Sequence, residues 1–247
     1  MAFKNHIPNS ITLLNLTSGI LSIYFGVKGT PADLVLAGIF IFAGAGFDFF
    51  DGLSARLLHA KSEIGLQLDS LSDMVTFGVA PGFILYQMLL LSHGNPVTSG
   101  IDFLPFLAIM VPWMSALRLA KFNIDETQAT SFKGLPTPAL AILIASLPII
   151  RQQLYPLQDF SYMIVTNTYF LLTVAIFGSL LLVTSFPMFS LKFKSFGWND
   201  NMMKYVFLAI SLVLVIWLQM LAVPFIFLLY LFLSLIMYLT DIQGQIP

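Results

Sequence analysis

The chain has 247 residues, of which 58% are hydrophobic and only 9% are charged, and its mean hydropathy is +0.90. This composition is typical of an integral membrane protein and excludes an ordinary soluble domain. The absence of cysteine excludes disulfide frameworks and thiolate chemistry, and a net charge of −1 without basic clusters argues against a nucleic-acid partner.

Hydropathy predicts an all-α bundle of about eight membrane-spanning helices, each near the ~20 residues that cross a bilayer. They form one membrane domain over 1–247, and the predicted spans are 9–28, 33–58, 65–91, 103–122, 136–151, 165–188, 203–219 and 222–240. The fifth has the weakest signal, because Pro138 and Pro148 bracket a short apolar run. The last two share one apolar stretch that is too long for a single span. Gln219 and Pro224 mark the expected turn, and one long kinked helix is the alternative.

Lysine and arginine positions predict the orientation. Nine of them fall on the side of the N-terminus, namely Lys4, Arg56, Lys61, Arg118, Lys121, Lys133, Lys192, Lys194 and Lys204. Only Lys28 and Arg151 fall on the other side. By the positive-inside rule, both termini face the cytoplasm of a multi-pass protein of the cell (inner) membrane. The first apolar segment lacks a small-residue cleavage site, so we expect it to be a span and not a cleaved signal.

Four aspartates lie inside apolar helices, and they are the most informative residues of the chain. Asp48 and Asp51 are three apart and Asp69 and Asp73 four apart, so each pair shares one helix face. A charged group at the helix centre costs about 2.5 to 3.5 kcal/mol, which requires a positive partner. Carboxylate oxygens suit Mg²⁺, Mn²⁺ or Ca²⁺ better than zinc. Four carboxylates exceed the need of one Mg²⁺, so two bridged ions that clamp a phosphoryl transfer fit better.

The residues around the aspartates favour a phosphate-bearing, nucleotide-like ligand. Gly52 and Ala55 leave room beside the Asp48 face, and Arg56 offers a fork of donors that suits phosphate. Gly65 lies where the third helix begins and the two helices that carry the aspartates must approach closely.

Two other interpretations of the aspartates remain open at this point. They could cap helices in a solvated loop around Arg56, His59, Lys61 and Glu63. They could also line the path of a divalent-cation transporter, although that function does not require Gly52, Ala55 and Arg56.

The complete spacing is Asp48-x2-Asp51-Gly52-x2-Ala55-Arg56-x8-Gly65-x3-Asp69-x3-Asp73, and it resembles the signature of the CDP-alcohol phosphotransferases at every defined position. Within that family, four further segments are similar to bacterial phosphatidylserine synthases, and they are 7–16, 68–81, 116–123 and 132–138. Phosphatidylglycerophosphate synthases usually carry arginine where Asn15 stands. Lys121 is a mild departure, since arginine is usual there. The resemblance covers about 7–150, and beyond that only hydrophobicity carries over.

The resemblance implies the family's fold, two Mg²⁺ or Mn²⁺ ions and a homodimer. Asp48, Asp51 and Asp69 would bind one ion, and Asp48, Asp69 and Asp73 the other, with Asp73 also accepting a proton. The implied CDP-binding residues are Asn9, Thr12, Gly52, Ala55, Arg56 and Ser62. Asn9 and Thr12 have a plainer interpretation as the N-terminal cap of a helix. We expect the catalytic core at about 7–190 and additional C-terminal helices at about 203–240.

The reaction implied by the resemblance is CDP-diacylglycerol plus L-serine giving phosphatidylserine and CMP. Arg118 is the candidate contact for the serine carboxylate or a phosphate, together with Lys121, although both could be charges that flank the span and reach the headgroups. Glycerol 3-phosphate or an inositol phosphate is the alternative acceptor, and an archaeal-type lipid is an alternative donor. A purely structural membrane protein fits least, because its buried acids would have no compensating role.

Overall fold

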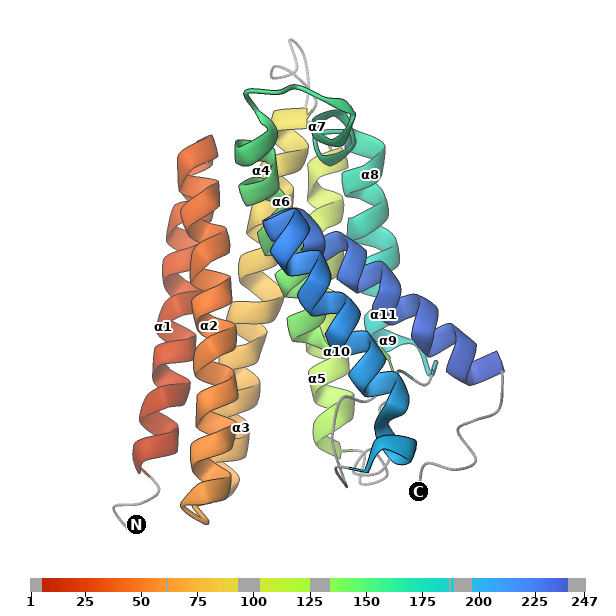
Figure 1. Ribbon diagram of the computed structural model, residues 1–247. Coiled ribbons are helices and arrows are strands. Elements are labelled where there is room, and N and C mark those ends of the chain that lie inside the picture. Colours follow the sequence, from red (N-terminus) through yellow and green to blue (C-terminus); the bar gives the residue numbers. More distant parts are fainter. Residues whose placement is uncertain are drawn as a thin grey trace.

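The computed structural model describes residues 6–60, 62–92, 103–124, 134–186, 188 and 197–239, and all regular structure within them is helical (Figure 1). The helices are α1 (His6–Lys28), α2 (Pro31–Leu57), α3 (Glu63–Asp73), η2 (Met74–Val79), α4 (Ala80–Ser92), η3 (Leu104–Ile109), α5 (Met110–Ile124), α6 (Thr137–Leu154), α7 (Phe160–Val165), α8 (Thr168–Thr173), η5 (Val174–Gly178), α9 (Ser179–Val183), α10 (Trp198–Leu218), η6 (Gln219–Leu221) and α11 (Ala222–Leu239).

Several of these elements join end to end, and the predicted all-helical membrane bundle is confirmed. α3, η2 and α4 form one helix over Glu63–Ser92. Six helical stretches of the described residues are long and apolar enough to cross a membrane, with Asn201–Leu239 counted as one stretch. A shorter apolar helix covers Thr168–Val183. It begins later and ends earlier than the predicted span 165–188, since Asn167 caps its first turn and the backbone becomes extended at Thr184.

The fifth predicted span, 136–151, forms a regular and well-buried helix despite its weak sequence signal. α6 runs from Thr137 to Leu154 with Pro148 inside it, and it is the most buried of the six candidate spans. An interior proline lacks a backbone donor, but packing against neighbouring helices can compensate in a membrane. At Gly38 of α2 an added Cβ would lie 2.4 Å from the Ala145 carbonyl oxygen, so the backbones of α2 and α6 touch.

The last apolar stretch forms a hairpin and not one long helix. The chain turns at Gln219, whose φ of 50° is unusual for a residue other than glycine, and η6 follows directly. α10 and α11 pack against each other and lean across the bundle (Figure 1). The predicted turn therefore lies at Gln219, while Pro224 belongs to the first turn of α11.

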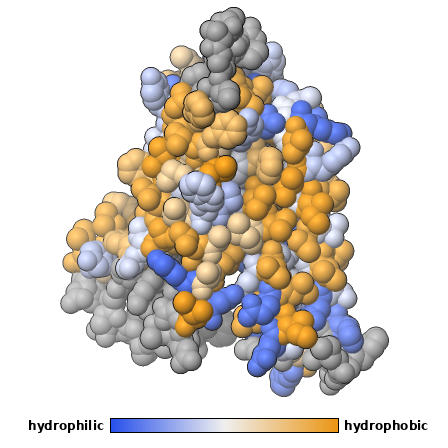
Figure 2. Space-filling model, turned by 180° about the vertical axis from the view of Figure 1, so that it is seen from behind, coloured by the Kyte–Doolittle hydropathy of each residue, from blue (hydrophilic) through white to orange (hydrophobic). Residues whose placement is uncertain are grey.

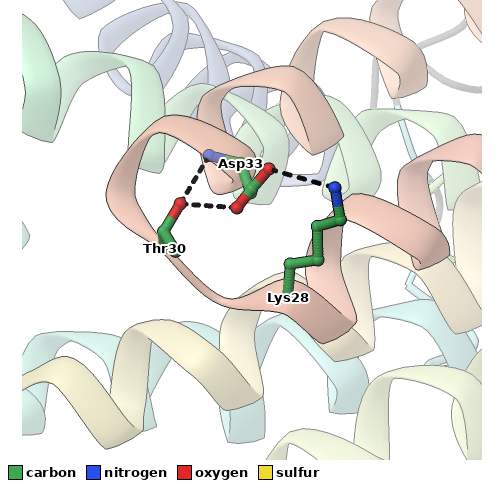
Figure 3. A network of polar contacts seen from close by, with 3 residues as sticks. All are labelled: Lys28, Thr30 and Asp33. Carbon is green, nitrogen blue, oxygen red and sulfur yellow. Dashed lines mark hydrogen bonds and ion pairs between the residues drawn. The ribbon is translucent and has the colours of Figure 1, made fainter.

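A polar cluster closes the turn between α1 and α2 (Figure 3). Thr30 is the N-cap of α2, accepting a hydrogen bond from the Asp33 amide at 3.2 Å and donating to its carboxylate at 2.5 Å. The ammonium of Lys28 lies 4.0 Å from Asp33 and over the rings of Tyr24 and Phe25. These contacts fix the α1–α2 hairpin at the end of the bundle opposite the α2–α3 junction (Figure 1).

The described lysines and arginines are unevenly distributed between the two ends of the bundle. Hydrophobic residues cover most of the middle of the rear face, and hydrophilic residues gather mainly toward its ends (Figure 2). Within the described residues, Arg56, Arg118, Lys121 and Lys204 lie toward the end where α1 begins, and Lys28 and Arg151 lie toward the other end. Five of the charges counted above, Lys4, Lys61, Lys133, Lys192 and Lys194, lie outside the described residues.

Candidate metal centre and active site

Three of the four aspartates converge between α2 and α3. Asp48 and Asp51 lie in the last three turns of α2, and Asp69 lies in the middle of α3. One carboxylate oxygen from each of them falls within 4.8 Å of the other two. Asp51 is buried and the other two are half-buried, so the cluster lies inside the bundle and not in a solvated loop. Since the N-cap of α3 is Ser62, the interpretation of these aspartates as helix caps is wrong.

The donor set fits a divalent cation. Asp51 Oδ2 and Asp69 Oδ1 are buried without a hydrogen-bond partner. Three converging carboxylates in a low-dielectric site repel one another, and a hard cation both offsets this repulsion and provides the missing partner. Mg²⁺ and Mn²⁺ prefer such oxygen ligands, and zinc sites more often use nitrogen and sulfur.

Asp73 lies beside this cluster and is held by the first helix. Its Oδ1 accepts a hydrogen bond of 3.3 Å from the side-chain amide of Asn15 in α1. Its carboxyl group also faces those of Asp48 and Asp69. The backbone changes from α-helix to the π-helix η2 directly after Asp73. Such π-helical insertions in α-helices are frequent at functional sites.

Two hydroxyl groups fix the register between α1 and the helix that carries Asp73. Ser72 Oγ donates to the Thr12 carbonyl at 3.0 Å, and Thr76 Oγ1 donates to the Asn15 carbonyl at 3.0 Å. An added Cβ at Gly19 or at Gly44 would lie 2.5 Å from the side chain of Thr76. The absence of side chains at these two positions therefore lets Thr76 reach α1. Asp73 therefore sits between two anchor points on α1.

The predicted CDP-binding residues surround the same end of the bundle. An added Cβ at Gly52 would meet no atom within 4 Å, so the space that the sequence predicts beside the Asp48 face is present. At Gly65 an added Cβ would lie 3.0 Å from Ser62 Oγ and 3.2 Å from Asn9 Oδ1. Gly65 thus permits the close approach of α3 to α1, whereas the sequence predicts that it serves the approach of the two aspartate-bearing helices.

Asn9 and Thr12 do not cap α1. The helix begins at His6, which places both residues within its first two turns. Thr12 Oγ1 donates to the Pro8 carbonyl, and its side chain also lies against the Asp51 carboxyl. The capping interpretation is therefore wrong, and both side chains remain available to the site from α1.

The three basic residues that the sequence predicts at the site differ in their exposure to solvent. Arg118 is partly buried in α5, donates from Nη1 to Thr137 Oγ1 at 3.4 Å, and has a buried Nε without a partner. Asp73 and Tyr230 of α11 are its charged or ionisable neighbours. Lys121 is exposed in the last turn of α5, and Arg56 is exposed near the end of α2. Arg118 therefore lies near Asp73 in a partly buried position, whereas Lys121 is exposed.

Sequence reasoning missed Asn15, Ser72, Thr76 and Tyr230 as neighbours of the site. A signal for α1 was present, because its small and polar residues recur every three or four positions; the stripe is Thr12, Asn15, Ser18, Gly19, Ser22 and Gly26, all of them buried. Such a stripe marks the face of a membrane helix that packs closely against others. Tyr230 carried no local signal, since only the fold brings α11 near Arg118.

Comparison with known proteins agrees with this geometry. The sequence profile described as CDP-alcohol phosphatidyltransferase matches residues 5–217, which extends the similarity well beyond the 7–150 expected from the motifs. Three similar proteins are each named CDP-diacylglycerol–serine O-phosphatidyltransferase. The one from Bacillus subtilis (strain 168) is 39% identical over 138 residues, covering 54% of this chain and 70% of the relative. The one from Mycobacterium leprae (strain TN) is 34% identical over 189 residues, covering 74% and 57%.

The third relative matches over most of both chains. The protein from Helicobacter pylori (strain ATCC 700392 / 26695) is 30% identical over 211 residues, which is 84% of this chain and 81% of the relative. Residues 5–217, which the family profile matches, include all four aspartates and the helices that carry them. This chain belongs to the CDP-alcohol phosphatidyltransferase family.

Proposed function

We propose that this protein transfers the phosphatidyl group of CDP-diacylglycerol to the hydroxyl of L-serine, giving phosphatidylserine and CMP. The observation that carries the proposal is the convergence of Asp48, Asp51 and Asp69 beside Asp73, in a chain with the full family signature. The names of the relatives support serine as the acceptor.

The aspartates would hold two Mg²⁺ or Mn²⁺ ions. Asp48, Asp51 and Asp69 would bind one ion, and Asp48, Asp69 and Asp73 would bind the second. When bound, such ions polarise the pyrophosphate of the donor and offset the charge that develops on departing CMP. The buried oxygens of Asp51 and Asp69 that have no partner support this assignment.

Asp73 is proposed as the base. The hydroxyl of serine is a weak nucleophile at neutral pH, so a carboxylate within hydrogen-bond reach is needed to accept its proton. The serine oxygen attacks the phosphorus next to diacylglycerol, the bond from that phosphorus to the CMP oxygen breaks, and CMP leaves with the electron pair. The absence of cysteine and of an evident serine–histidine pair in the signature favours this direct displacement over an enzyme-bound intermediate.

The nucleotide would occupy the space that Gly52 leaves open. Arg56 lies one turn further along α2 and would contact a phosphate, while Asn9, Thr12 and Ser62 approach from α1 and the start of α3. Ala55 keeps this face free of bulk. The diacyl chains would remain in the bilayer beside the apolar helices.

The positive-inside bias supports a cytoplasmic site and cytoplasmic termini. The site lies at the same end of the bundle as Arg56, Arg118, Lys121 and Lys204. The homodimer that the family resemblance implies stays a prediction.

The test of the function is CMP release by the purified protein in mixed detergent–lipid micelles containing CDP-diacylglycerol and Mn²⁺. L-serine, glycerol 3-phosphate, an inositol phosphate or no acceptor is supplied in parallel. Serine-dependent release together with phosphatidylserine formation is the expected result. Release only with another acceptor would overturn the choice of serine. No release with any acceptor, combined with Mn²⁺ flux in proteoliposomes, would favour a cation transporter.

Arg118 is proposed to bind the carboxylate of serine, because it is partly buried, near Asp73, and has an Nε without a partner. Replacing it with glutamine removes the fork of donors and the charge, so the KM for serine should rise by about tenfold or more. The KM for CDP-diacylglycerol should change much less. Initial rates at varied serine and varied donor measure the difference.

The matched control is Lys121→Gln, which removes a cation from an exposed position of the same helix. It should leave both KM values within about twofold of wild type, as exposed charges usually contribute little. Equal effects of the two substitutions on serine would contradict a specific role for Arg118. A rise in the KM of the donor alone would assign Arg118 to the phosphate of the lipid.

A further inference from the structure

Asn15 is the most unusual polar residue of the first helix. Its side chain is fully buried, in a helix that is long and apolar enough to span the membrane. The other buried polar side chains of α1 are hydroxyl groups that donate to main-chain carbonyls: Thr12 to Pro8, Ser18 to Leu14, and Ser22 to Ala37. Asn15 instead directs its amide at a carboxylate 58 positions away, Asp73.

The orientation of this amide is fixed by chemistry. An ionised carboxylate only accepts hydrogen bonds, so the Nδ2 group of Asn15 must face Asp73 and Oδ1 must face away. Oδ1 is then buried without a partner. It lies near Gly44 of α2, where an added Cβ would come within 3.1 Å of it. Burying an amide oxygen unpaired is unfavourable, so the stability of α1 does not explain the presence of asparagine here.

The main chain of Asn15 is tied to the same region as its side chain. Its carbonyl accepts the hydrogen bond from Thr76, which lies almost one turn after Asp73. The side-chain amide and the main-chain carbonyl of Asn15 thus contact the helix that carries Asp73 at two successive points. This double attachment limits rotation of the Asp73 side chain, and it engages Oδ1 but not Oδ2 of that carboxylate.

We propose that Asn15 is a positioning residue that holds Asp73 by one carboxylate oxygen so that the other oxygen can accept the proton of the acceptor hydroxyl. The inference rests on the proposed role of Asp73 as the base. It predicts that Asn15 affects turnover more than the binding of either substrate, because misplacement of a catalytic group by about 1 Å can cost on the order of 100-fold in rate.

The test compares two variants that cannot donate to Asp73. Asn15→Leu is similar in size and has no donor, and Asn15→Ser has a hydroxyl too short to reach Asp73 that can bond within α1, as Ser18 does. In each variant kcat should fall about 10- to 100-fold. The KM for CDP-diacylglycerol, the affinity for CDP with Mn²⁺ by calorimetry, and the midpoint of thermal unfolding should stay close to wild type.

The matched control is Ser22→Ala, which removes a fully buried hydrogen bond of the same helix two turns away from Asn15. This variant should keep kcat near the wild-type value. The comparison separates a general weakening of α1 from loss of the hydrogen bond between Asn15 and Asp73. If both Asn15 variants keep kcat within about twofold of wild type, the proposal is overturned. It is also overturned if affinity for CDP with Mn²⁺ falls as far as kcat, since Asn15 would then act on the metal centre.

These outcomes differ from a failure of the proposed function. If wild-type protein releases CMP with an acceptor other than serine, serine is wrong, and the same kcat comparison with that acceptor decides the role of Asn15. If the wild-type protein releases no CMP with any acceptor, both the proposed function and the positioning role are overturned.

Discussion

Replacing Asp73 with asparagine should lower kcat for serine-dependent CMP release by about 10² to 10⁴-fold, which is the usual contribution of a general base. Asparagine has nearly the same shape but cannot accept the proton. Asp73 lies beside the group of three carboxylates that converge within 4.8 Å and is not one of them. Asp73 is also a proposed ligand of the second ion, but its loss leaves all three carboxylates of the first ion's site in place. Binding of CDP with Mn²⁺ should therefore persist, within about tenfold, when measured by calorimetry.

This pair of measurements separates the role of Asp73 as a base from its role as a metal ligand. A variant that retains both turnover and binding would show that another group accepts the proton. A variant that loses both would show that Asp73 acts mainly as a ligand. The Asp73→Asn protein should also keep the thermal unfolding midpoint of wild type, because its side chain still fits between Asn15 and Asp48.

Replacing Asp48 with asparagine should have a different and equally large effect. Asp48 belongs to the converging cluster and also faces Asp73, so it is one of the two carboxylates, with Asp69, that both proposed ions share. Loss of a direct ligand should cost more than the roughly 10- to 100-fold in metal affinity that outer-shell substitutions cost. CMP release should fall to background, and removal of metal from wild-type protein with a chelator should produce the same loss, reversible by Mn²⁺ or Mg²⁺.

The control for Asp48→Asn lies on the same helix. Asp33 is an aspartate in the first turn of α2, at the opposite end of the bundle, where it contacts Thr30 and Lys28 (Figure 3). Asp33→Asn should leave the Mn²⁺ concentration for half-maximal activity unchanged. If Asp48→Asn also leaves it unchanged, the cluster is not the metal centre.

Local sequence was sufficient to predict the catalytic helices. Helical periodicity places Asp48 and Asp51 on one face and Asp69 and Asp73 on another, so the sequence predicted that two facing helices bring these carboxylates together. Hydropathy likewise located the helices, because a segment long and apolar enough to cross a bilayer is recognised without knowledge of its neighbours.

The remaining features depend on contacts between distant parts of the chain. The bond from Asn15 to Asp73 depends on how α1 docks against α3, and that docking depends on glycines at positions 19, 44 and 65. α6 was underestimated because Pro148 lowers its local helical signal, while its stability comes from burial among neighbouring helices. The position of Tyr230 near Arg118 depends on the α10–α11 hairpin leaning across the bundle.

The location of the aspartates at one end of the bundle has a consequence for the whole membrane. Under the proposed function, water-soluble CMP would leave toward one aqueous compartment, and the new phospholipid would be delivered to the adjacent leaflet alone. The headgroup of phosphatidylserine is charged, so its spontaneous passage across the hydrocarbon core is unfavourable. A bilayer supplied in this way grows on one side only, and balanced growth of its other leaflet requires a separate protein that translocates lipids.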